Sequence, residues 1–324
     1  MQCTNHLKQF GLAIHNFHDT QGYLPPSALG EQWPSMYPLL YPYMEQQAIY
    51  DVFCSTKDSY GRSGTAKFVF DLTAASPWAF WENEPDHATR PGLGEAGRKG
   101  ICSISYFICP SRRSGMAMAV PVAPNLNGAY PGPQTDYAFP IETDLTMRTS
   151  VGGIPGLNWW RWFPQMLETN YEATRAPFHR TVGKILTGQT TSTTWEARTT
   201  FSAWQDGTSN QLCLGEKYCR VDCPVGTAPD ANSSWSLGDA GYLSVRDKYT
   251  TSIARTFSNY GIARGLNDTY TSAAGEPQLF GSAHPDICNF LLGDGSVRTI
   301  PVKTDGILLT RLADPIDGVT ASVP

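Results

Sequence analysis

The sequence predicts an α+β fold in which an N-terminal amphipathic helix packs against an antiparallel β-sheet. Three observations lead to this prediction. Apolar residues recur at helical spacing near the N-terminus. A content of 30 Gly and 24 Pro, with only 16% charged residues, is typical of a turn-rich, β-dominated protein. In the second half, Asp-Gly turns lie beside apolar runs and indicate β-hairpins.

The N-terminal helix is expected over residues 1–22. Its apolar residues follow one another at alternating steps of four and three, which places them on one stripe of a helix. Gly22 is a suitable C-terminal stop, and Pro25 and Pro26 cannot continue the helix. The stripe consists of Cys3, Leu7, Phe10, Ile14 and Phe17. Leu7, Phe10, Ile14 and Phe17 are therefore predicted to pack the helix onto the sheet or into an assembly.

The later elements are predicted from shorter patterns. A second helix is expected over residues 43–53, and residues 105–110 are expected to form a strand that ends at a proline. Further strands are expected at 136–139, at 200–204 and 211–216 around the Asp206-Gly207 turn, and at 287–292 and 296–300 around Asp294-Gly295. Residues about 55–100 and 150–200 are expected to be long, loop-rich insertions. No linker divides the chain, so residues 1–324 are expected to form a single domain.

Composition and motifs exclude several classes of function. A net charge of -5 without basic runs argues against a nucleic-acid surface. No window approaches 18 uninterrupted apolar residues, so no span is expected within this sequence. No nucleophile elbow, zinc-binding helix or phosphate-binding glycine loop occurs. We therefore expect a protein that is not an enzyme, with no catalytic residues.

Eight cysteines are present, and none belongs to a Cys-x-x-Cys pair. The close pairs Cys102/Cys109 and Cys219/Cys223 could each close a small disulfide loop. Disulfides are the favoured interpretation, ahead of buried free thiols and of a metal site. The connectivity cannot be deduced from the sequence.

Two Asp-Gly elements contain the candidate site residues of the second half. His284 with Asp286 and Asp294 could surround a cation or a sugar. The simpler interpretation is structural: Asp294-Gly295 forms a tight turn, and His284 hydrogen-bonds to backbone nearby.

Calcium is the other ligand considered, because it prefers oxygen ligands from turns. Asp206, Asn210 and Glu216 could supply such oxygens, but an Asx turn at Asp206-Gly207 is the simpler account. No cofactor is therefore expected, with calcium as the alternative.

Aromatic residues cluster in both predicted insertions. The second cluster contains Trp159, Trp160 and Trp162. These side chains could form a small core under a loop, a contact between subunits, where aromatic residues are enriched, or a stacking platform for sugar rings. The sequence leaves the three interpretations open.

Four motifs resemble those of one known family. They are Cys3-Thr4-Asn5-His6-Leu7-Lys8-Gln9, Phe107-Ile108-Cys109-Pro110-Ser111, Asp206-Gly207-Thr208-Ser209-Asn210 with Gly215-Glu216, and His284 followed after nine residues by Asp294-Gly295. In this order they resemble the prepilin-type cleavage and processing-associated family of unknown function that is abundant in planctomycetes. The regions 55–100 and 150–200 lie outside the resemblance.

The resemblance implies a pilin-like fold, as in type IV pilins and type II secretion pseudopilins. It also implies a prepilin cleavage site and an apolar helical half upstream. This sequence lacks both, so its first helix would be the soluble half of a longer helix, and a membrane would be reached only through the missing segment.

The function expected from the resemblance is a non-enzymatic structural subunit. It would be extracellular or at the cell surface, facing the periplasm during assembly, and would self-assemble into a filament or surface structure. The alternative is a secreted glycan- or solute-binding module that binds polysaccharide through the aromatic clusters.

Overall fold

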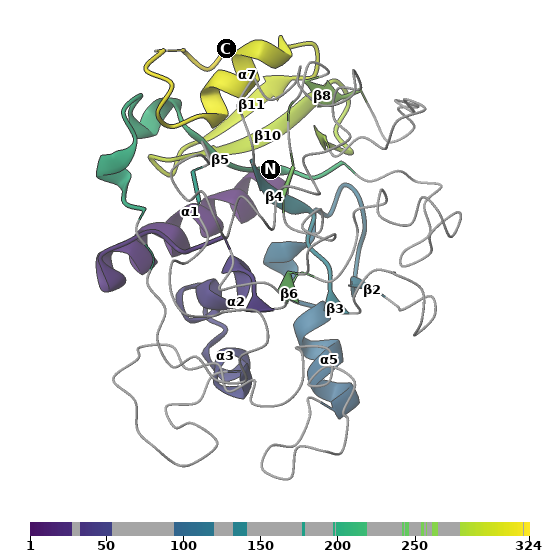
Figure 1. Cartoon of the computed structure of the whole chain (residues 1–324). Coiled ribbons are helices and arrows are strands. Elements are labelled where there is room, and N and C mark those ends of the chain that lie inside the picture. The colour runs from purple at the N-terminus through teal and green to yellow at the C-terminus, as the bar shows by residue number, and fades with distance from the viewer. Residues whose placement is uncertain are drawn as a thin grey trace, which may run out of the picture.

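The computed structural model describes a set of segments that together form one helix-on-sheet body (Figure 1). In Figure 1, α1 crosses the molecule with the sheet on one side and the shorter helices α2 and α3 on the other. The described residues are 1–27, 33–53, 94–119, 132–140, 177–178, 197, 199–218, 242, 244–245, 254–255, 257, 261–264, 279–319 and 321–324.

Helix α1, Gln2–Gln21, confirms the predicted N-terminal helix. It ends at Gly22, whose φ of 82° is left-handed and whose N–H donates to the carbonyl of His18. Gly11 lies on the buried side and permits a close approach, because a Cβ there would lie 2.9 Å from Cδ1 of Leu291. The whole predicted stripe is buried, and so are the small residues Gly11 and Ala13. The buried residues of α1 are Cys3, Leu7, Phe10, Gly11, Ala13, Ile14 and Phe17.

The helical region after α1 is more divided than predicted. The expected single helix at 43–53 is replaced by α2 (Met36–Leu40), η1 (Tyr41–Met44) and α3 (Gln47–Phe53). The break occurs at Glu45, whose φ of 60° ends the 3-10 turn before α3 begins. Helix α5 (Gly94–Cys102) occupies the end of the region expected to be irregular, most of which lies outside the described residues.

Residues 105–110 do not form the predicted strand. Ser105–Phe107 is a 3-10 helix, η2. Its backbone hydrogen bonds are local, such as that from the Ile108 N–H to the Ser105 carbonyl, and do not pair it with a neighbouring strand. The β-branched and aromatic residues that suggested a strand are instead used for burial, since Phe107 is only 1% exposed. Tertiary packing therefore overrides the local β-propensity.

The main sheet confirms the α+β prediction. Its strands lie in the order β11-β10-β5-β4-β7. Neighbours from β11 to β4 are antiparallel, and β7 is parallel to β4. The bounds are β4 Tyr137–Pro140, β5 Leu212–Glu216, β7 Ala254–Arg255, β10 Ile287–Leu292 and β11 Val297–Pro301.

Shorter elements complete the described fold. Three two-stranded pairs join β1 with β6, β2 with β3, and β8 with β9. Helix α7 (Gly306–Ala313) begins at Asp305, whose side chain accepts a hydrogen bond from the N–H of Ile307. The remaining bounds are β1 Trp33–Pro34, β2 Met118–Ala119, β3 Gly132–Pro133, η5 Phe201–Ala203, η6 Thr208–Asn210, β6 Ser244–Val245, β8 Ile262–Ala263 and β9 Phe280–Gly281.

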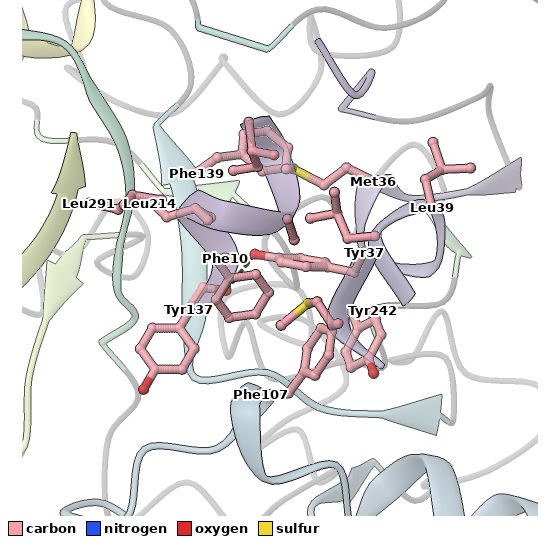
Figure 2. Close-up of a cluster of buried hydrophobic side chains, with 14 of the residues drawn as sticks. Phe10, Met36, Tyr37, Leu39, Phe107, Tyr137, Phe139, Leu214, Tyr242 and Leu291 are labelled. Atoms are coloured by element: carbon pink, nitrogen blue, oxygen red, sulfur yellow. Dashed lines mark hydrogen bonds between the residues drawn. The ribbon is translucent and has the colours of Figure 1, made fainter. Parts of the chain in front are cut away.

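The alternation of side chains along the strands separates two hydrophobic clusters. On β10, Leu291 belongs to the hydrophobic cluster that also contains the buried residues of α1, which we call the α1 cluster. Phe290 and Leu292 belong to a second cluster, which contains Leu309 of α7. This is the period of two expected of a strand that is covered on both faces. Figure 2 shows the α1 cluster, in which Phe10 lies among aromatic side chains from other elements.

The two Asp-Gly turns differ in outcome. The predicted hairpin at Asp294-Gly295 is confirmed, with Gly295 at a φ of 80° between β10 and β11. The predicted strand before Asp206-Gly207 is wrong, because Phe201–Ala203 forms the 3-10 helix η5. The two turns nevertheless pack together, since the N–H of Asp294 donates to the carbonyl of Thr208 at 3.1 Å.

Gly215→Ala is expected to lower the free energy of unfolding by about 1–3 kcal/mol, the usual cost of overpacking a core. A Cβ at Gly215 would lie 2.4 Å from the Phe290 ring and 2.8 Å from the Phe280 ring. Both rings are fully buried and cannot give way cheaply. The matched control is Gly100→Ala on α5, where a Cβ meets no atom within 4 Å. Urea unfolding should show the control equal to or above wild type, and an equal loss in both variants would contradict the packing argument.

Candidate functional site

His284 and Asp294 do not form one site. They precede and follow β10, so the length of that strand separates them. The Oδ1 atom of Asp294 accepts a hydrogen bond from the N–H of Ser296 at 2.8 Å, as expected of a turn residue. His284 instead faces Cys3, Cys109 and Glu216. We call these four residues the donor cluster.

The donor cluster joins four segments that are distant in sequence. Cys3 lies in the first turn of α1, and Cys109 follows η2. Glu216 is the last residue of β5, and His284 lies just before β10. One donor atom from each residue can be chosen so that all four lie within 4.8 Å of one another. Cys3, Cys109 and Glu216 are each 2% exposed, so three of the four side chains are shielded from water.

The contacts within the cluster are short. The sulfur atoms of Cys3 and Cys109 lie 2.7 Å apart. Oε1 of Glu216 lies 3.6 Å from Sγ of Cys109 and 3.1 Å from Nε2 of His284. The last two atoms are close, but their alignment is not that of a hydrogen bond, and the buried Nε2 atom has no hydrogen-bond partner. The four donor atoms therefore converge on one small volume.

The sheet fixes the carboxylate of Glu216. The register that pairs Gly215 with Phe290 brings Glu216 beside Asn289 on β10. Oε2 of Glu216 accepts hydrogen bonds from the backbone N–H and the side-chain amide of Asn289, at 2.8 and 3.0 Å. Only Oε1 is then directed at the cysteines and the histidine.

The segment that carries Cys109 is held from two sides. Nδ1 of His6 on α1 lies 3.0 Å from the carbonyl of Ile108. The N–H of Cys109 donates to Oδ2 of Asp136 at 2.7 Å. Asp136 is itself buried and forms ion pairs with Arg112 and Arg113. These neighbours position the Cys109 sulfur against Cys3.

Burial and hydrogen bonding set the protonation of the cluster. The hydrogen bond with Cys109 lowers the pKa of Cys3, whereas that hydrogen bond, followed by burial, raises the pKa of Cys109. Either sulfur can be the donor between Cys3 and Cys109, and Oε1 of Glu216 is a second acceptor within reach of the Cys109 thiol. Burial raises the pKa of Glu216, because the charged carboxylate loses water. If these buried groups ionise, the negative charge on sulfur and carboxylate needs a compensating positive charge nearby.

The other predicted site residues are not brought together. Asp206 and Asn210 precede β5, whereas Glu216 ends it, so an extended strand of about 13 Å separates the expected calcium ligands. Asp206 lies near Asp317 and Asp314, and burial, followed by these charges, raises its pKa. Gly207, at a φ of 85°, forms the turn itself. Trp159, Trp160 and Trp162 lie outside the described residues, so the platform for sugar rings stays a prediction.

No disulfide bond joins the cysteines that the structure describes. The predicted Cys102/Cys109 loop is not closed, since Cys109 turns toward Cys3 in place of Cys102. Cys54, Cys219 and Cys223 lie outside the described residues. The five free thiols are Cys3, Cys102, Cys109, Cys213 and Cys288, and all of them are buried.

The sequence predictions named His284 and Glu216 as candidates but did not place Cys3 and Cys109 in the site. A usable signal was present, because each donor lies in a different one of the four motifs on which the family resemblance rests. Spacing alone could not join them, since 106 positions separate the two cysteines.

Fold and cluster together define a class: an α+β protein whose N-terminal helix lies on an antiparallel sheet, with a buried cluster of two cysteines, a glutamate and a histidine at one end of that helix. The chain belongs to the family described as "Protein of unknown function (DUF1559)", whose model matches residues 1–306. No curated protein and no solved structure matches the chain. Among the described residues, no helix has the length and apolar character needed to cross a membrane.

Proposed function

We propose that this protein is a non-enzymatic structural subunit that self-assembles through the outer face of α1 into a filament or cell-surface structure. The resemblance of its motifs to prepilin-type proteins supports a pilin-like subunit outside the cell. Membership of the DUF1559 family is in keeping with this proposal, although the description of that family assigns no activity.

The observation that carries the proposal is the division of α1 into two faces. One face packs against β10 and contributes Leu7, Phe10 and Ile14 to the α1 cluster. The opposite face is open over the length of the helix, from Gln2 through Asn5, Gln9, Leu12 and Asn16 to Asp19. A helix that is fixed to its own sheet on one side can contact a second copy with the other side.

Leu12 is the residue on this open face that fits an interface best. Its side chain is 57% exposed, and it is the large apolar residue among polar neighbours. A single exposed leucine is not unusual on a monomer. In a repeating assembly, however, the same leucine would be buried in every subunit. A charged side chain at this position would then destabilise every contact between subunits, because an unpaired charge is costly to bury.

Leu12→Glu is therefore expected to reduce assembly at least tenfold while leaving the fold unchanged. The matched control is Ile307→Glu on α7, which is also apolar and is 44% exposed. Filaments of the natural full-length protein would be counted by negative-stain electron microscopy, and oligomers measured by light scattering. Assembly of Leu12→Glu at the wild-type level, or dispersed wild-type monomers under all assembly conditions, would overturn the proposal.

A further inference from the structure

We propose that Cys3, Cys109, Glu216 and His284 bind one zinc ion, which fastens the N-terminal turn of α1 to the sheet. The proposal does not depend on assembly, because it concerns the folding of a single chain. It rests on the identity of the four donors, on their separations and on the groups that hold them.

The donor set suits zinc better than other common divalent ions. Two thiolates, an imidazole and a carboxylate combine soft and borderline ligands, which zinc accepts in tetrahedral sites. Calcium and magnesium bind through oxygen ligands, of which this cluster directs only Oε1 of Glu216 inward. The choice of zinc therefore follows from two cysteines in a group of four.

The separations are close to those of a tetrahedral site. With ordinary zinc–ligand distances, a sulfur and an oxygen lie about 3.6 Å apart, and a nitrogen and an oxygen about 3.4 Å apart. The corresponding distances here are 3.6 Å for Cys109 to Glu216 and 3.1 Å for His284 to Glu216. Two bound sulfurs lie about 3.8 Å apart, so Cys3 and Cys109 must separate by about 1 Å as zinc enters.

A disulfide bond between Cys3 and Cys109 is the main alternative, and the surrounding groups argue against it. The sulfurs are 2.7 Å apart, between the length of about 2.05 Å of a disulfide bond and the separation of about 3.8 Å of two zinc-bound sulfurs, so the other donors decide. A disulfide has no proton to donate, so it would leave Oε1 of Glu216 without the Cys109 thiol. The buried Nε2 of His284 has no hydrogen-bond partner beside the free thiols, and a disulfide would not supply one. A cation at the centre satisfies the carboxylate, the imidazole and both sulfurs together.

The neighbours of the cluster match those of a preformed metal site, in which outer groups orient the ligands. Asn289 holds Oε2 of Glu216, and the Cys109 N–H is held by Asp136. The N–H of His284 donates to Oγ of Ser282 at 3.0 Å. These bonds fix the Glu216 carboxylate and the backbone that carries Cys109 and His284 before the metal arrives.

The site is closed, which assigns the metal a structural role. A catalytic zinc keeps one position open for water or substrate, whereas a structural zinc has four protein ligands. Here four donors are available, and three of the residues are 2% exposed. Because Oε2 of Glu216 is held by Asn289, the carboxylate can offer only one oxygen to the metal. Zinc would then join α1, the loop after η2, the end of β5 and the start of β10.

The test begins with the full chain, purified under reducing conditions and analysed for metal by mass spectrometry. We expect one zinc per chain. Removal by a strong chelator should lower the melting temperature, and added zinc, but not magnesium, should restore it. Cobalt substitution should give a thiolate charge-transfer band and the intense visible bands of tetrahedral cobalt. This readout comes from the wild-type chain, so it does not depend on whether any variant folds.

Variants then assign the metal to these residues. His284→Ala and Cys109→Ala should each weaken zinc binding by more than about 100-fold, more than the loss of an outer-shell group costs. The control is Cys102→Ala, which removes an equally buried thiol from α5 and should keep one zinc. Circular dichroism would verify that the variants compared are folded.

Two results would overturn the proposal. One is reduced, folded protein that takes up neither zinc nor cobalt while its oxidised form contains a Cys3–Cys109 cross-linked peptide. The other is zinc that binds to His284→Ala and Cys109→Ala as tightly as to wild type, which would place an adventitious ion elsewhere. Because filament formation is not measured here, failure of this test leaves the assembly proposal standing on its own experiment.

Discussion

Phe10→Ala is expected to lower the free energy of unfolding by about 3–5 kcal/mol, the usual cost of removing a buried aromatic ring. Phe10 is fully buried on α1 and lies at the centre of the aromatic cluster in Figure 2. Its ring centroid is 5.1 Å from that of Phe107, 5.6 Å from Tyr137 and 5.8 Å from Tyr37. All three contacts are edge-to-face, an arrangement that stabilises the fold beyond the contribution of the buried apolar area. One ring thus connects α1, α2, η2 and β4.

The cavity left by Phe10→Ala cannot close cheaply, because its neighbours are held by hydrogen bonds. The hydroxyl of Tyr37 donates to the carbonyl of Tyr137 at 2.7 Å, and Phe107 is backed by Tyr41 and Tyr242, whose hydroxyls bond to each other at 2.8 Å. Rigid walls favour the upper part of the expected range.

Urea unfolding monitored by circular dichroism would measure the change. The control is Leu12→Ala, two positions along α1 but 57% exposed, which should change stability by less than about 0.5 kcal/mol. A loss below about 1 kcal/mol for Phe10→Ala, far under the usual cost of such a cavity, would show that α1 is not held by this cluster.

The parts of the fold that the sequence predicted are those in which one local pattern decides the structure. The α1 stripe and Gly22 both act within a few residues, and together they define a helix and its end. The β10–β11 hairpin is similar, since apolar runs on either side of Asp294-Gly295 leave few alternatives. No later contact had to override these signals.

The errors occur where distant contacts decide between local alternatives. Residues 105–110 have strand propensity, but Phe107 packs against Phe10, and Cys109 bonds to Asp136, so the chain turns there. Asp206-Gly207 resembles a hairpin turn, yet its loop binds the next turn through Thr208 and Asp294. Such contacts join positions about 30 to 100 apart in the chain, beyond the reach of any periodicity.

The donor cluster could be predicted only in part, for the same reason. His284 and Glu216 stand out as polar residues beside otherwise apolar strand regions. Cys3 looked like one more apolar residue of the α1 stripe, because free cysteine behaves as a small hydrophobe. Its different use becomes visible only when α1 lies on the sheet and Cys109 meets it.

Asp136→Ala is the second change expected to have a large effect, with a loss of about 3–5 kcal/mol in the free energy of unfolding. The side chain of Asp136 is 1% exposed. It forms ion pairs with the guanidinium groups of Arg112 and Arg113 and accepts the N–H of Cys109. Removing the carboxylate leaves two largely buried guanidinium groups and a buried N–H without this partner. Breaking a buried ion pair in this way is strongly destabilising, because it leaves uncompensated charge in the interior.

Asp136→Asn separates the ion pairs from the hydrogen bond to Cys109. The asparagine carbonyl can still accept the N–H of Cys109, whereas the amide NH2 replaces the oxygen that accepts from Arg112 and Arg113, so the charge and those two hydrogen bonds are lost. We expect its effect to lie between those of wild type and Asp136→Ala. The surface control is Asp19→Ala, whose side chain is 80% exposed and should matter by less than about 0.5 kcal/mol.

The order of these variants tests how the donor cluster is held. If Asp136→Asn is as stable as wild type while Asp136→Ala is not, the hydrogen bond to Cys109, and not the ion pairs, fixes this segment. If both are as stable as wild type in thermal and urea unfolding, the buried carboxylate does not stabilise the fold. A graded loss would instead show that charge and hydrogen bond act together, because one carboxylate binds the arginines that follow Cys109 and also the backbone of Cys109 itself. The position of the Cys109 sulfur against Cys3 then depends on a charge that lies immediately before β4.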